Sequence, residues 1–146
     1  SYQWNVLEIF VSVYDHALSK TNILDGLRIA PNVRGIFLSN ESMVLAYLEL
    51  VKEGRIDPRS LHVAGFDMTP EIAEAILEEQ LVFSIVQAPL EIGSAAVREI
   101  LPLLQQHPYQ ESEDLRVTLI PVVKMGKHEV LASQKQAKNG EALLFA

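Results

Sequence analysis

The chain has 146 residues, 49% of them hydrophobic, which is enough for one domain with a buried core. Its formal net charge of −7 argues against direct binding to DNA, RNA or an anionic membrane, because each of these needs a clustered basic surface. The sequence contains no cysteine, which excludes disulfides and thiolate metal sites, and no apolar run is long enough to insert into a bilayer.

The first hundred residues repeat a strand followed by a helix. Runs of β-branched, aromatic and aliphatic residues predict strands at 7–13, 33–38, 61–66 and 81–86. Apolar residues at helical spacing follow each predicted strand. This alternation predicts an α/β fold with three layers, in which a parallel sheet is covered by helices on both faces.

Short-range signals locate the helix boundaries and the end of the repeat. Asn40 can cap the second helix, and Thr69 can cap the third. Pro102 should kink or end the fourth helix. Residues 115–123 are typical of an extended strand, and in residues 124–146 we expect a polar tail with one short strand and a loose end.

Polar side chains stand directly after the predicted strands. Asp15 and His16 follow the first strand, Asn40 the second, Asp67 the third and Gln87 the fourth. Ligands of such sheets bind beyond the carboxyl ends of the strands, so these residues should gather on one rim. Their carboxylate and amide groups suit a sugar or polyol, whereas a phosphate would need Arg, Lys or a glycine-rich loop.

Structural roles could also explain most of these residues. Asn40 is a good helix cap, Asp67 could be a turn residue, and Asp15 with His16 could simply open a helix. Gln87 has no obvious capping role. No nucleophile–base pair and no histidines at metal-ligand spacing are evident, so we expect no enzyme activity, no catalytic residue, no metal ion and no cofactor.

Three motifs resemble those of type I periplasmic sugar-binding proteins and of the lactose/galactose-repressor family. Asn-Glu-Ser-Met at 40–43 is similar to their Asn-Asp-x-Met step, and Ala-Gly-Phe-Asp at 64–67 to their Val-Gly-Phe-Asp step. Val-Gln-Ala-Pro at 86–89, with Gly93 and Ala-Val at 96–97, is similar to their Gln-x-Pro…Gly…Ala-Val step. Tyr14 and Asp15 stand where the family has an aromatic–Asp pair.

The resemblance covers roughly residues 7–123. It implies the C-terminal lobe of a two-lobed protein that closes about a hinge on a sugar, with Asn40, Asp67 and Gln87 contacting the ligand. The sequence has no match to the family's N-terminal lobe. It also has no match to the strand and helix that normally precede the segment corresponding to residues 7–13. Because that strand is usually central, its loss would expose unpaired strand edges. The chain is therefore expected to be a truncated fragment, a proteolytic remnant or a partner-completed assembly.

The two branches of this resemblance differ in function. The Pro-containing segment at 55–60 is similar to a linker of the repressors. We therefore interpret residues 1–123 as the partial ligand-binding lobe of a cytoplasmic, homodimeric transcriptional regulator that responds to a sugar, with 124–146 as its tail and no nucleic-acid contact by this lobe. The alternatives are a periplasmic solute-binding component of a sugar ABC transporter and a stand-alone flavodoxin-like signalling or interaction domain.

Overall fold

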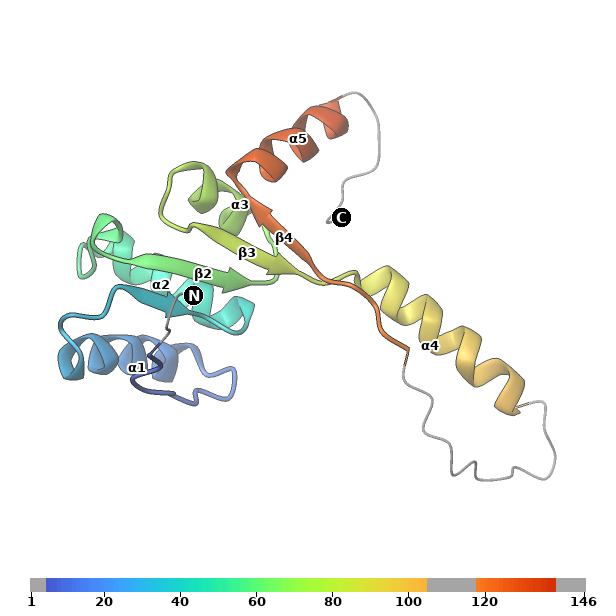
Figure 1. Cartoon of the computed structure of the whole chain (residues 1–146), viewed down its shortest axis with the longest axis horizontal. Coiled ribbons are helices and arrows are strands. Elements are labelled where there is room, and N and C mark those ends of the chain that lie inside the picture. The colour runs from blue at the N-terminus through green and yellow to red at the C-terminus, as the bar shows by residue number, and fades with distance from the viewer. Residues whose placement is uncertain (1–4, 105–117, 139–146) are drawn as a thin grey trace. The chain divides into compact units, whose positions relative to one another are not determined.

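The computed structural model describes residues 5–104 and 118–138 (Figure 1). Its elements in chain order are α1 (His16–Ile29), β1 (Gly35–Phe37), α2 (Glu41–Lys52), the 3-10 helix η1 (Pro58–Ser60), β2 (His62–Phe66), α3 (Pro70–Leu77), β3 (Phe83–Val86), α4 (Pro89–Leu104), β4 (Val123–Gly126) and α5 (Lys127–Lys138). The chain forms two compact units, one comprising residues 1–86 and 124–146 and the other residues 87–123. The predicted α/β fold class is confirmed.

The first unit is built on a sheet with the strand order β1-β2-β3-β4. Strands β1, β2 and β3 are parallel, with Phe37 beside Ala64 and Gly65 beside Ser84. At the end of β4, a Cβ added to Gly126 would lie 3.6 Å from the carbonyl oxygen of Val82, just before β3 begins. The end of β4 thus meets the start of β3, so β4 runs opposite to its neighbour (Figure 1).

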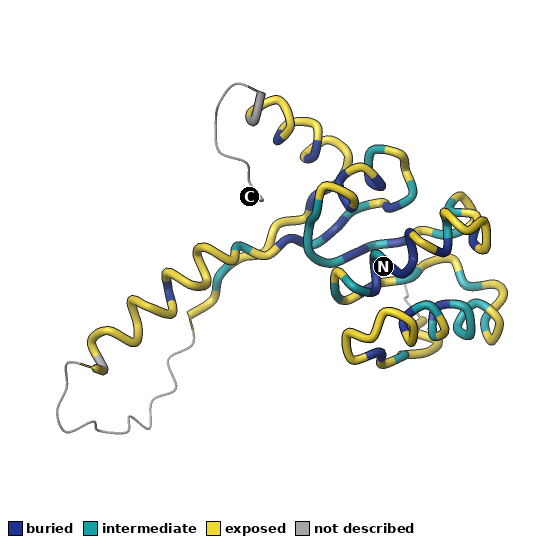
Figure 2. The backbone as a smooth tube through the Cα atoms, turned by 180° about the vertical axis from the view of Figure 1, so that it is seen from behind, coloured by how far each residue is buried: buried dark blue, intermediate teal, exposed yellow. Residues whose placement is uncertain are grey.

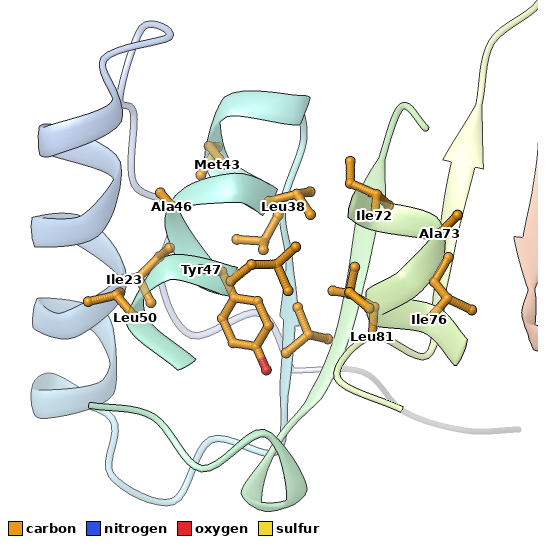
Figure 3. Packing of buried hydrophobic residues seen from close by; sticks show 14 of the residues in the cluster. Ile23, Leu38, Met43, Ala46, Tyr47, Leu50, Ile72, Ala73, Ile76 and Leu81 are labelled. Carbon is orange, nitrogen blue, oxygen red and sulfur yellow. The ribbon is translucent and has the colours of Figure 1, made fainter. Parts of the chain in front are cut away.

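One face of this sheet is covered by helices α2 and α3. Burial alternates along the central strands, so that Val63 and Gly65 of β2 and Ser84 and Val86 of β3 are buried. Figure 3 shows how the side chains of the core gather between the helices and the strands. The largest fully buried side chains of this core are Tyr47, Leu38, Leu50, Ile72, Ile76 and Leu81.

Helix α1 packs on α2 through both apolar and charged contacts. Ile23 of α1 is buried in the core. At the surface, His16 Nε2 lies 2.8 Å from Glu49 Oε2, and Lys20 forms ion pairs with Glu49 and Glu53. Exposed ion pairs are individually weak, so the apolar contacts dominate the stability of this helix pair.

The strand predicted at 7–13 is absent, and this expectation was wrong. Residues 5–12 have no regular structure and form no ladder with any described strand. The apolar side chains of the predicted strand are mostly exposed: Ile9 by 78%, Val11 by 73% and Val13 by 78%. A strand is stable only where a neighbour satisfies its backbone groups. Here the segment is held instead by α1, because Asn22 Nδ2 donates to the Val11 carbonyl at 3.2 Å.

The end of the chain also differs from the expected elements. Residues 118–122 have no regular structure, the strand begins only at Val123, and residues 115–117 lie outside the described part. Helix α5 replaces the expected loose end, and Val130 and Ser133 on it are buried. The sequence of α5 shows little apolar periodicity, so the helix could not be predicted from the sequence and is recognised only by its packing in the unit. The division of the chain at residue 123 stays a prediction.

Helix α4 forms most of the described part of the second unit. Pro102 lies inside it, in its last turn, where the missing N–H leaves the carbonyl of Arg98 without its helical donor. The helix is largely exposed, with Ala95 as its buried residue among those described (Figure 2). In the described residues, no helix combines the length and the apolar character needed to cross a bilayer.

Candidate sugar-binding rim

Asn40 lies between β1 and α2 and caps the helix. Its Oδ1 accepts a hydrogen bond from the backbone N–H of Met43 at 3.0 Å, which satisfies one of the free donors in the first turn. The residue is partly buried. The cap uses only Oδ1, so the Nδ2 amide is not needed for it and is chemically suited to donate to a hydroxyl of a ligand.

Asp67 directly follows β2, and its backbone is in the left-handed region with a φ of 68°. Its N–H donates to the carbonyl of Ile85 at 2.8 Å, and its carbonyl accepts from Ser84 Oγ at 2.6 Å. Two residues later, Thr69 Oγ1 accepts from the Ile72 N–H at 3.2 Å and caps α3. The turn that carries Asp67 is therefore fixed at both ends.

The register of the sheet brings Asn40 and Asp67 to the same edge. Phe37 is paired with Ala64 in the parallel ladder of β1 and β2. Each of the two candidate residues stands three positions beyond its member of this pair. A carboxylate and an amide thus lie at the carboxyl ends of adjacent parallel strands, as the sequence predicted from the strand order.

Asp15 and His16 occupy the start of α1 and follow no strand. Asp15 Oδ1 accepts from the Leu18 N–H at 2.8 Å and so caps α1. The imidazole of His16 is bonded to Glu49 of α2, and this bond holds the pKa of the Glu49 carboxyl below its usual value, with Lys20 adding to the effect. The side chains of Asp15 and His16 are exposed. These contacts give each residue a structural role, and their contact with a ligand stays a prediction.

The loop before α1 nevertheless approaches the start of α2. Ser42 Oγ lies 3.4 Å from the carbonyl oxygen of Tyr14 and donates to it. Ser42 is in the first turn of the helix that Asn40 caps. The loop carrying Asp15 therefore reaches the neighbourhood of Asn40 by contact with a helix rather than by following a strand of the sheet.

Gln87 directly follows β3 and is exposed. It is the first residue of the second unit, and its contact with a ligand stays a prediction. The same unit contains an open depression of about 440 Å³ lined by Leu90, Ser94, Arg98 and Ile120, among others. None of the predicted site residues lines it.

One residue that supports this rim from below was missed by sequence reasoning. Ser84 is fully buried in β3, and its hydroxyl bonds to the carbonyl of Asp67. The sequence does carry a signal, because a serine on the buried face of an apolar strand must find a partner. The sequence does not identify that partner.

Among the described residues, no group of three or more His, Asp or Glu side chains could hold a metal ion.

Known proteins resemble this chain in sequence over most of its length. No protein-family model matches it. The ribose import binding protein RbsB of Escherichia coli (strain K12) is 27% identical over 122 residues, which is 82% of this chain and 40% of that protein. RbsB of Salmonella typhimurium (strain LT2) matches with the same identity and shares. The chain thus spans about two fifths of the length of the curated relatives it matches.

Solved structures resemble it in fold. An ABC transporter solute-binding protein from Agrobacterium vitis, bound with α-D-tagatopyranose, matches with a TM-score of 0.70 and 19% identity over 97% of this chain and 44% of that one. A periplasmic solute-binding protein from Actinobacillus succinogenes 130z with bound D-allose matches with a TM-score of 0.61 and 20% identity, over 82% and 40%.

These similarities change the interpretation drawn from the sequence. The expected cytoplasmic location is wrong, because the relatives are import binding proteins and solute-binding proteins of transporters, one of them described as periplasmic. They favour the transport alternative over the regulator. The homodimer expected with the regulator stays a prediction. The resemblance in fold is confirmed: the chain has the type I periplasmic-binding-protein-like fold of sugar-binding lobes.

Proposed function

We propose that this chain is a sugar-binding lobe of the solute-binding component of an ABC-type sugar importer and works in the periplasm. The observation that carries the proposal is the position of Asn40 and Asp67 at the carboxyl ends of the adjacent parallel strands β1 and β2. The sequence similarity to a ribose import binding protein supports the transport role.

The chemistry of the rim favours a neutral polyhydroxylated ligand. The Asp67 carboxylate would accept hydrogen bonds from sugar hydroxyls, and the Asn40 Nδ2 group would donate to a hydroxyl oxygen while Oδ1 keeps its cap on α2. Asp15 and His16, at the start of α1, and Gln87 would add further polar contacts to the ligand. The ligand class is a pentose or hexose monosaccharide, in keeping with the ribose, tagatose and allose of the similar proteins.

A single lobe supplies only one side of a sugar-binding cleft. Two lobes that close on the ligand contact both of its faces and exclude water, which one lobe cannot do. We therefore propose that a second lobe, outside this chain, completes the site. The isolated chain should bind monosaccharides weakly or not at all, because half of the contacts are missing. Micromolar binding of a monosaccharide by the isolated chain would contradict this part of the proposal.

The first experiment is to read the coding sequence upstream of Ser1. A signal peptide followed by a similar lobe supports the transport protein. A helix-turn-helix segment followed by that lobe would instead indicate a regulator. An upstream sequence that encodes no such second lobe would overturn the two-lobed proposal.

The second experiment tests the site itself by calorimetric titration of the full-length translation product with D-ribose, D-allose and D-tagatose. Asp67→Asn removes the charge but keeps a residue type that tolerates a positive φ. Asn40→Ser keeps a capping hydroxyl but removes the amide donor. Each variant should weaken the best sugar by roughly tenfold or more, since a buried hydrogen-bonding group loses its partner. Unchanged affinity in both would rule out this rim as the site.

A further inference from the structure

The backbone of Asp67 is held in a conformation that L-residues rarely adopt. Its φ of 68° is unfavourable for every residue with a Cβ, although Asp and Asn tolerate it better than most. Such a conformation persists only where surrounding contacts enforce it. At a residue proposed to bind a ligand, φ decides the direction in which the side chain leaves the backbone.

Two consecutive residues of β3 enforce this conformation. The Ile85 carbonyl accepts from the Asp67 N–H at 2.8 Å, and the Ser84 hydroxyl donates to the Asp67 carbonyl at 2.6 Å. The first bond extends the contacts between two parallel strands. The second comes from a side chain, so it depends on the identity of one residue, and Ser84 is fully buried.

The space for the Ser84 hydroxyl is itself created by its neighbours. Ser84 is paired in register with Gly65 of β2. A Cβ at position 65 would lie 3.3 Å from Ser84 Oγ and 3.0 Å from Val44 Cγ2 on α2. The absence of a side chain at Gly65 thus leaves room for both the hydroxyl and the helix above it.

Resting on the proposed function, we propose that Ser84 is a positioning residue for sugar binding. Its hydroxyl holds the Asp67 carbonyl and thereby fixes the left-handed backbone that sets the direction of the Asp67 carboxylate. Ser84 is buried beneath the rim and would not touch the sugar itself. Its loss should therefore weaken binding only as long as the Asp67 carboxylate is present.

A double-mutant cycle tests this dependence. The affinity of the full-length translation product for D-ribose, D-allose and D-tagatose is measured with Ser84→Ala, with Asp67→Gly and with both changes. Glycine accepts a positive φ without strain, so Asp67→Gly removes the carboxylate while keeping the turn. Ser84→Ala should raise Kd by about three- to tenfold alone, and should leave Kd unchanged when Asp67 is already glycine.

A control variant shows whether the loss of any buried serine hydroxyl has the same effect. Ser133 of α5 is also buried, and within the described residues its hydroxyl has no hydrogen-bond partner. Ser133→Ala should leave Kd unchanged. In the 146-residue chain, the backbone ¹³C shifts and the HN–Hα coupling of Asp67 should move away from left-handed values in Ser84→Ala but not in Ser133→Ala.

The outcomes distinguish this inference from the function on which it rests. If Asp67→Gly leaves sugar binding unchanged, the proposed site fails and the role of Ser84 fails with it. If Asp67→Gly weakens binding but Ser84→Ala alone does not, only the positioning role is overturned. An equal effect of Ser84→Ala in both backgrounds would also overturn it, because the effect would then not pass through Asp67.

Discussion

The hydroxyl of Tyr47 donates to the backbone carbonyl of Gln80 at a distance of 3.2 Å and so joins α2 to the segment that leads into β3. Tyr47 is fully buried, and this burial raises its pKa to about 12, with the nearby charge of Asp57 adding to the effect. A buried hydroxyl between two elements should contribute to stability in a pH-dependent way.

We expect Tyr47→Phe to lower the free energy of unfolding by about 1 kcal/mol at pH 7, because the Gln80 carbonyl loses its donor. The tyrosine pKa is raised in the folded state, so its contribution is complete below the unfolded pKa of about 10 and is lost as the pH rises toward 12. The destabilisation caused by Tyr47→Phe should therefore shrink between pH 10 and pH 12. Urea unfolding across this range measures it, and a constant difference would contradict the assignment.

His16→Ala should raise the pKa of Glu49 toward its usual value, because the hydrogen bond from His16 is the main cause of the lowered pKa. Part of the lowering should remain, since Lys20 also contacts this carboxylate. A lowered pKa contributes stability above the unfolded value that is lost as the pH falls through the folded one. Titration of the Glu49 side-chain ¹³C shift by NMR checks the direction. An unchanged Glu49 pKa in the variant would show that the pair does not persist in solution.

Gly65→Ala should destabilise the first unit by about 1–3 kcal/mol, which is typical of overpacking in a core. The added methyl would lie 3.0 Å from Val44 Cγ2, and neither strand nor helix can move without disturbing the core. Gly35→Ala is the matched control, because its Cβ would meet only the His62 carbonyl oxygen at an ordinary 3.5 Å. Thermal unfolding of both variants should show a clear loss only for the first. Equal melting temperatures would mean that α2 relaxes away from β2.

Asn40→Ala should cost about 1 kcal/mol of stability, because the first turn of α2 loses the acceptor for the Met43 N–H. Asn40→Ser should cost much less, since serine also caps helices well. Chemical denaturation of the two variants measures the difference. If both are equally destabilised, the stabilising role of Asn40 lies in a contact other than its cap.

Local signals allowed the helix starts to be predicted correctly. Asn40 and Thr69 cap α2 and α3 as expected, because a cap depends only on a side chain and the N–H group three residues later. The strand order along the sequence also placed Asn40 and Asp67 on one edge of the sheet, since parallel strands have their carboxyl ends at the same edge.

Elements that depend on distant partners were not predictable in the same way. Residues 7–13 have the composition of a strand but form no ladder with a described strand, because composition cannot supply a neighbour. Helix α5 was missed because the burial of Val130 comes from packing that brings α5 beside α3. The sequence alone pointed to transport only as an alternative; similarity to known import and transport proteins made it the better reading.

By itself, the sequence determined the α/β class, the capped helix starts and the carboxylate and amide groups of the rim, because these follow from periodicity and from contacts within a few residues. Only the tertiary structure decided which strands pair, how Asp67 is held, and that the hydroxyl of Ser84 is the group that holds it. The physical reason is that a hydrogen bond between residues 17 positions apart exists only after the strands have been brought together.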